Sequence, residues 1–127
     1  MLLIAGQALR IDPLLKLGRG GYSRALAYIS KNSSSVITYV GSDQDFRNGM
    51  LVEFYAPLAA KDKIIQYVER SKWSQTRPDW MLTHSQNLSL QAPQDIVASE
   101  IGFYRLVEEY RFAGVSGWNW FLYRRQE

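Results

Sequence analysis

The stretch AGVSGWNWFLYRR, from Ala113 to Arg125, carries the most information about the fold of this chain. Gly114 and Gly117 permit a tight turn at its start. After the turn, large apolar side chains occupy both alternating sets of positions, with the two-residue period of a strand. A strand that is apolar on both faces is typical of a core strand buried between two layers. The alternative is an aromatic platform for a ligand, formed by Trp118 and Trp120.

Length and composition limit the class of protein. The chain has 127 residues, which fit one domain (residues 1–127) with a real hydrophobic core. Its apolar and charged fractions, 46% and 21%, are those of an ordinary soluble globular protein. The absence of cysteine excludes disulfides, thiolate zinc sites and a cysteine nucleophile. A formal net charge of +3 is too mild to indicate a nucleic-acid partner, and we expect none.

The chain begins with an apolar run, MLLIAGQAL. This run is too short to span a bilayer, which needs about 20 apolar residues. Residues 1–17 are therefore either a first buried helix or the remnant of a membrane-proximal helix. Basic residues follow at Arg10, Lys16, Arg19 and Arg24, a pattern typical of either a membrane flank or a solvated helix face.

Two helices are expected in the first half of the chain. The first has an apolar stripe at i, i+3, i+4 and i+7, formed by Tyr22, Ala25, Leu26 and Ile29. The second has a stripe at four-residue spacing that is expected to face the core, formed by Phe46, Met50, Phe54 and Leu58 and widened by Leu51 and Tyr55. Pro57 is expected to end or kink this second helix.

Strands are expected between and after these helices, over residues 36–40, 63–68, 80–83, 103–112 and 118–123. The polar stretch 85–99 is either a functional loop or contains a short unrecognised element. The strand–helix–strand order predicts a right-handed parallel crossover, and the last two strands predict an antiparallel hairpin. The predicted fold is therefore an α/β domain with a small mixed β-sheet, flanking helices and a C-terminal antiparallel hairpin.

The best polar cluster follows the first predicted strand, in the segment GSDQDFRN. Open α/β folds place ligands at the carboxyl ends of strands. Asp43 and Asp45 suit a hard cation, and Arg47 suits a phosphate held together with the amides of the helix N-terminus. In the alternative, Ser42, Asp43 or Asp45 caps the helix, and Arg47 pairs with one of the aspartates.

The single histidine, His84, is a further candidate. It ends a predicted strand and is either a general base or a structural histidine. The segment GRGG at residues 18–21 fits neither phosphate-binding glycine motif. No catalytic residue, metal ligand set or cofactor is assigned from the sequence.

Four segments together resemble a known class of protein: GRGGYSRALAYIS (18–30), VGSDQDFRNGMLVEFYA (40–56), PDWMLTHS (78–85) and YRFAGVSGWNWFLYRR (110–125). They resemble the soluble C-terminal domain of bacterial polytopic mannosyltransferase-like membrane glycosyltransferases, which use lipid-linked sugars. The resemblance covers most of the chain. It implies that residues 1–17 end the last membrane helix and that the domain lies on the extracytoplasmic side of the membrane. The catalytic acids of that superfamily lie in an earlier loop, so the resemblance transfers no catalytic residue to this chain.

Three functional hypotheses follow. The leading one is a non-catalytic accessory domain that packs on the membrane-embedded portion of the same polypeptide and contacts a glycan or a lipid phosphate. Its contact residues would come from Arg47, the 85–99 stretch and the aromatic C-terminal strand. The second is a freestanding small metal- or phosphate-binding enzyme that uses Asp43, Asp45 and Arg47, with His84 beside them. The third is a protein–protein interaction module that self-associates through the apolar N-terminus; the oligomeric state is not predicted.

Overall fold

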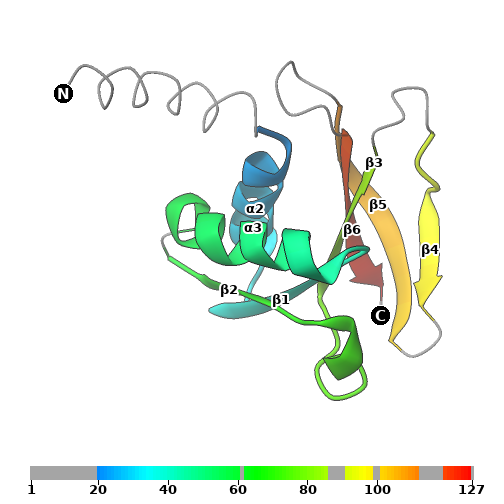
Figure 1. Cartoon of the computed structure of the whole chain (residues 1–127), viewed down its shortest axis with the longest axis horizontal. Coiled ribbons are helices and arrows are strands. Elements are labelled where there is room, and N and C mark those ends of the chain that lie inside the picture. Colours follow the sequence, from blue (N-terminus) through cyan, green and yellow to red (C-terminus); the bar gives the residue numbers. More distant parts are fainter. Residues whose placement is uncertain (1–19, 61, 86–90, 99–100, 112–118, 127) are drawn as a thin grey trace.

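The computed structural model describes residues 20–60, 62–85, 91–98, 101–111 and 119–126. They form one six-stranded mixed sheet with two helices over one face (Figure 1). The predicted α/β class with a mixed sheet is confirmed. The elements are α2 (Gly20–Asn32), β1 (Ile37–Ser42), α3 (Asp45–Ala59), β2 (Ile64–Tyr67), the short 3-10 helix η2 (Arg70–Lys72), β3 (Trp80–Ser85), β4 (Asp95–Ala98), β5 (Gly102–Tyr110) and β6 (Asn119–Gln126).

The strand order in the sheet is β2-β1-β3-β6-β5-β4. β1 pairs in parallel with both β2 and β3, which confirms the parallel crossover through α3. β6 pairs antiparallel with β3 on one side and with β5 on the other, which confirms the C-terminal hairpin. The polar stretch 85–99 contains a short element, β4, which pairs with β5. The described strands therefore divide into a parallel half and an antiparallel half, joined between β3 and β6.

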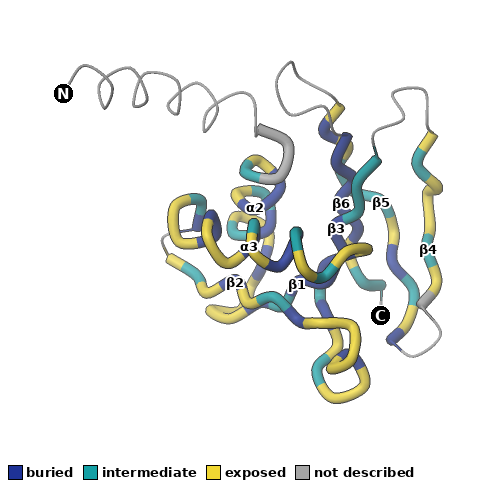
Figure 2. Tube along the Cα trace, in the orientation of Figure 1, coloured by how far each residue is buried: buried dark blue, intermediate teal, exposed yellow. Residues whose placement is uncertain are grey.

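The strand β6 is buried on both faces, as predicted for a core strand (Figure 2). Trp120 and Leu122 point into the cluster between the sheet and the helices, together with Leu26 and Ile29 of α2. Phe121 and Tyr123 point to the opposite face, into a second cluster whose members include Val68, Trp73, Met81, Ile101 and Tyr104. The apolar character of both faces of this segment therefore reflects two separate cores, one on each side of the sheet.

The helix α2 buries its predicted stripe at Ala25, Leu26 and Ile29, whereas α3 does not bury the stripe expected of it. Phe46 and Phe54 of α3 are 77% and 67% exposed, and Met50 and Leu58 are exposed as well. Residues four apart advance by about 40° around a helix at each step, so these four residues lie within about 120° of one another and share one face, which is turned to solvent. The prediction that these four residues face the core is wrong.

The buried face of α3 carries Asn48, Gly49, Val52, Tyr55 and Ala56, so Tyr55 from the margin of the predicted stripe is buried, and the face includes one glycine and one amide. Close approach of the helix to the sheet explains this choice. A Cβ added at Gly49 would lie 3.2 Å from the ring of Tyr67 on β2. The helix also continues through Pro57 to Ala59, so Pro57 lies inside its last turn and does not end it.

Asp79 joins β1 to the start of β3. Its Oδ2 accepts hydrogen bonds from the Tyr39 N–H (3.0 Å) and Thr38 Oγ1 (3.2 Å), and its Oδ1 lies 3.3 Å from Arg125 Nη2 on β6. β1 also packs closely against the segment before β3, because a Cβ added at Gly41 would lie 2.9 Å from Pro78 Cγ. These contacts fix β1 and β3 side by side, so their carboxyl ends meet at the opposite end of the sheet.

Among the helices that the structure describes, none combines the length and the apolar character needed to cross a bilayer. The proposed membrane-proximal remnant, residues 1–17, lies outside the described residues.

Candidate functional site

The sequence-predicted candidates Asp43, Arg47 and His84 meet at the carboxyl ends of two adjacent parallel strands. Asp43 follows β1, and His84 lies next to the last residue of β3. Arg47 belongs to the first turn of α3, which begins two residues after Asp43. The parallel pairing of β1 and β3 brings together groups that lie about forty positions apart in the chain.

Asp43 holds His84 through both of its carboxylate oxygens. Oδ1 lies 2.8 Å from the ring Nδ1, and Oδ2 accepts a 3.2 Å hydrogen bond from the backbone N–H of His84. Asn48 Nδ2 also donates to Oδ1, at 3.1 Å. The histidine side chain is only 16% exposed, and its ring lies against Trp120, with ring centroids 5.7 Å apart. The imidazole is therefore oriented by a carboxylate on one edge and packed on an indole.

Arg47 contacts the other ring nitrogen of His84. Its Nη2 lies 2.6 Å from Nε2. A guanidinium only donates hydrogen bonds, so Nε2 is the acceptor and the ring proton lies on Nδ1, where it is donated to Asp43. The His84 ring therefore lies between the carboxylate of Asp43 and the guanidinium of Arg47.

The helix N-cap is Gln44, a residue that the sequence-based prediction did not consider. Its Oε1 accepts from the Arg47 N–H at 2.7 Å, and its carbonyl accepts from the Asn48 N–H at 3.2 Å. Neither Asp43 nor Asp45 caps the helix. These two amides of the first turn already have partners, so the guanidinium is the group that Arg47 offers to an anion.

Asp45 lies in a separate hydrogen-bond group. Its Oδ1 accepts from the Tyr67 hydroxyl at 2.7 Å, and its Oδ2 accepts from the Arg70 N–H at 3.1 Å. Ser42 Oγ lies 2.7 Å from the same hydroxyl. Burial raises the pKa of Tyr67 above its ordinary value, the Ser42 hydrogen bond lowers it, and the contact with Asp45 raises it further. Tyr67 therefore serves as a neutral donor that ties α3 to β2.

The two carboxylates do not converge on a common point. Within the described ranges, no group of three or more His, Asp or Glu side chains is arranged to hold a metal ion. The arrangement is that of an Asp–His–Arg row, suited to binding an anion or to acid–base chemistry, rather than that of a cation cage.

The aromatic candidates have different outcomes. Trp120 is 3% exposed and packs in the core behind His84, so it is not an open platform for a ligand. Trp118 lies outside the described residues. Sequence reasoning included Asn48 in the polar cluster without giving it a role, and it missed Tyr67. The available signal for Asn48 was a polar residue on the face of the helix that packs on the sheet. Tyr67 carried no such signal, because a tyrosine is an ordinary strand residue.

Comparison of the chain with protein-family models, with curated proteins and with solved structures gives no match.

Proposed function

We propose that this protein is a non-catalytic accessory domain of a membrane-bound glycosyltransferase-like protein, and that it contacts the phosphate of a lipid-linked substrate through Arg47. The proposal combines the sequence resemblance with one observation, the 2.6 Å contact between Arg47 Nη2 and His84 Nε2. This contact holds a guanidinium at the carboxyl ends of β1 and β3, where open α/β sheets commonly bind ligands, and this supports the proposal. Guanidinium groups bind phosphate oxygens through paired hydrogen bonds.

Binding of phosphate compounds tests the ligand part of the proposal. The probes are geranyl phosphate and inorganic pyrophosphate, with neutral geraniol as the control ligand. Because His84 is the only histidine, its ring signals in NMR spectra report directly on the site. We expect geranyl phosphate to shift these signals and geraniol to leave them unchanged.

Arg47→Ala should weaken binding of geranyl phosphate by about tenfold or more, the usual loss for a charge-assisted pair. The thermal midpoint should remain nearly unchanged. Arg105→Ala, which removes an exposed arginine paired with Asp95 on β4, is the matched control and should bind normally. An equal loss of binding and thermal stability in Arg47→Ala would make the residue structural instead.

The membrane part of the proposal has its own test. Membrane and soluble fractions of the native cells are probed with an antibody against this domain. A band in the membrane fraction much larger than 14.6 kDa supports a domain of a polytopic protein. A soluble band near 14.6 kDa contradicts it.

The Asp43–His84 pair favours a second candidate function, a small enzyme that acts on a phosphate-bearing substrate. A carboxylate on Nδ1 is the arrangement that orients a histidine base. The Arg47 guanidinium would then move from Nε2 of His84 to the phosphate of the substrate. The freed Nε2 would take the proton of the attacking water. Hydrolysis of p-nitrophenyl phosphate that disappears in His84→Gln would support this function, whereas unchanged hydrolysis would eliminate it. A metal-dependent version further requires that Mg²⁺, Mn²⁺ or Ca²⁺ raise the thermal midpoint and that Asp43→Asn abolish the rise.

A further inference from the structure

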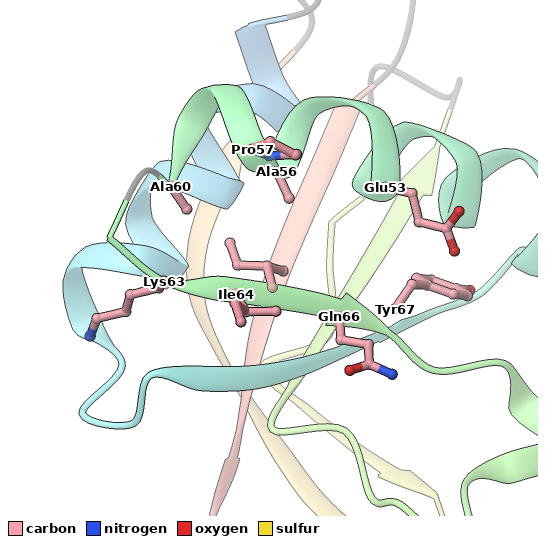
Figure 3. A pocket seen from close by; sticks show the side chains of 9 residues that line it. Glu53, Ala56, Pro57, Ala60, Lys63, Ile64, Gln66 and Tyr67 are labelled. Atoms are coloured by element: carbon pink, nitrogen blue, oxygen red, sulfur yellow. The ribbon is translucent and has the colours of Figure 1, made fainter.

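A groove runs between α3 and the edge strand β2 (Figure 3). Glu53, Ala56 and Pro57 of α3 form one wall of the groove, and β2 forms the other. The groove has a volume of about 400 Å³. A second hollow shares Glu53 and Tyr67 with the first and extends it along the helix past Phe46 and Met50. Two of the unexpectedly exposed apolar residues of α3, Phe46 and Met50, therefore line a hollow that adjoins the groove at Glu53 and Tyr67.

The backbone of β2 presents alternate amides to this groove. The N–H groups of Ile64 and Val68 donate to the carbonyls of Val36 and Val40 on the β1 side. Because successive N–H groups of a strand point in opposite directions, those of Ile65 and Tyr67 point away from β1, toward the outer edge. An outer edge of this kind is a template for one more strand.

Opposite charges mark the two ends of the groove. Glu53 lies beside Tyr67 at one end and Lys63 lies at the other, as Figure 3 shows. Glu69, which follows β2, adds a second carboxylate to the acidic end. Within the described part of the chain, the carboxylates of Glu53 and Glu69 form no hydrogen bond or ion pair. Their charge is available to a partner.

We propose that this groove binds an extended peptide segment of another protein, which adds to the sheet as a strand antiparallel to β2. An antiparallel strand places its first residues beside Glu53 and Glu69 and its last residues beside Lys63. The complementary segment therefore starts with a basic residue, continues with apolar residues at alternate positions, and ends with an acidic residue.

The register follows from the outward amides. Residues paired with Ile65 and Tyr67 exchange hydrogen bonds with them, and their side chains point to the α3 side of the sheet, as those of Ile65 and Tyr67 do. In the heptapeptide acetyl-KTVTVTE-amide, the two valines pair with Tyr67 and Ile65. The terminal lysine and glutamate then pair with Glu69 and Lys63.

The charge order of the peptide provides the first test, measured by calorimetry with the full chain. Acetyl-KTVTVTE-amide should bind at least about tenfold more tightly than acetyl-ETVTVTK-amide, because two favourable charge pairs become two repulsive ones. The double substitution Glu53→Lys with Glu69→Lys should largely abolish this preference, because each peptide then makes one attractive and one repulsive terminal pair, with Lys63 unchanged. Asp95→Lys, on the opposite edge strand β4, changes charge equally per residue and should leave the order unchanged.

Amide NMR shifts provide the second test. The peptide should shift the signals of Ile65 and Tyr67 more than those of Ile64 and Gln66. Equal affinity for the two peptides, shifts that avoid β2, or no binding by either peptide would overturn the proposal. A dimer in sedimentation equilibrium without peptide, dissociated by the Glu53 and Glu69 substitutions, would assign the groove to a second copy of the chain and equally overturn it.

Discussion

The carboxylate of Asp43 contacts His84 twice, at ring Nδ1 (2.8 Å) and at the backbone N–H (3.2 Å). It thereby joins the loop after β1 to the end of β3 and selects the Nδ1-protonated form of the ring. The same side chain thus stabilises the fold and sets the chemistry of the candidate site.

Substitution Asp43→Asn should disturb both roles. We expect the free energy of unfolding to fall by about 1 kcal/mol, a value reduced by the partial exposure of the carboxylate. The single-histidine nitrogen spectrum should change from mainly the Nδ1-protonated form to a mixture of both forms. Asp95→Asn, which loses only an exposed ion pair, serves as the control in urea denaturation. An unchanged histidine spectrum would show that Asp43 does not set the ring state.

The reversed burial of α3 can be measured directly. Val52→Ala should lower the free energy of unfolding by about 2 kcal/mol, because a buried side chain is truncated and leaves a cavity. Phe54→Ala removes a larger side chain but should cost less than about 1 kcal/mol, because that ring is exposed. Urea denaturation of the two variants compares these costs. A larger loss for Phe54→Ala would mean that the exposed face is covered in solution.

Gly41 should tolerate no side chain. In Gly41→Ala, the new Cβ would lie 2.9 Å from Pro78 Cγ, so we expect a loss of about 1–3 kcal/mol from overpacking. Pro78→Ala removes the nearest of the crowding atoms, whereas Trp73 Cζ2 and Nε1 remain 3.1 Å from the new Cβ. The double variant should therefore be more stable than the sum of the two single losses predicts, and a double-mutant cycle measures this coupling. If the two losses of stability add strictly, the new Cβ at position 41 does not clash with Pro78.

Stability should decline at alkaline pH because buried tyrosines resist ionisation. Burial raises the pKa of Tyr104 to about 12, and burial also raises the pKa of Tyr110 to about 12. Between pH 10 and 12 the unfolded chain loses these protons and the folded chain retains them, so the free energy of unfolding falls as pH rises. Each tyrosine contributes a slope of up to about 1.4 kcal/mol per pH unit.

The variant Tyr104→Phe tests the origin of this slope. It loses the 2.6 Å hydrogen bond to the Pro78 carbonyl, so its stability at pH 7 should be about 1 kcal/mol lower. Its decline above pH 10 should be shallower than that of the wild type. The measurement is the urea midpoint of both proteins from pH 9 to 11.5. If the midpoints of the variant and the wild type fall in parallel, the alkaline loss of stability comes from other groups.

Much of the fold was predictable because its signals are local. The β-branched run before Gly41 and the doubly apolar Trp120–Tyr123 segment indicated strands from sequence alone, and both are strands. β4 was not identified, because the segment Asp95–Ala98 is too short to show a clear period. The orientation of α3 was predicted wrongly because hydrophobicity alone does not register how closely Gly49 approaches Tyr67.

The sequence predicted where the candidate site lies but not which of its residues contact one another. The rule for strand ends located Asp43 and Arg47, and His84 was noted as a separate candidate. Their contacts depend on the parallel pairing of β1 with β3, which brings together residues 41 positions apart. Gln44 was missed as the cap because glutamine is not among the residues that usually cap helices.

The central position of β6 has a consequence for the order in which the chain folds during synthesis. β6 is the last described strand to leave the ribosome, yet it lies between β3 and β5. Until it emerges, β3 and β5 each present an open strand edge, and the two halves of the sheet are held together by no strand pairing. The nascent chain thus carries two unpaired strand edges until β6 is translated, and a pause in that interval exposes these edges to mispairing with neighbouring chains.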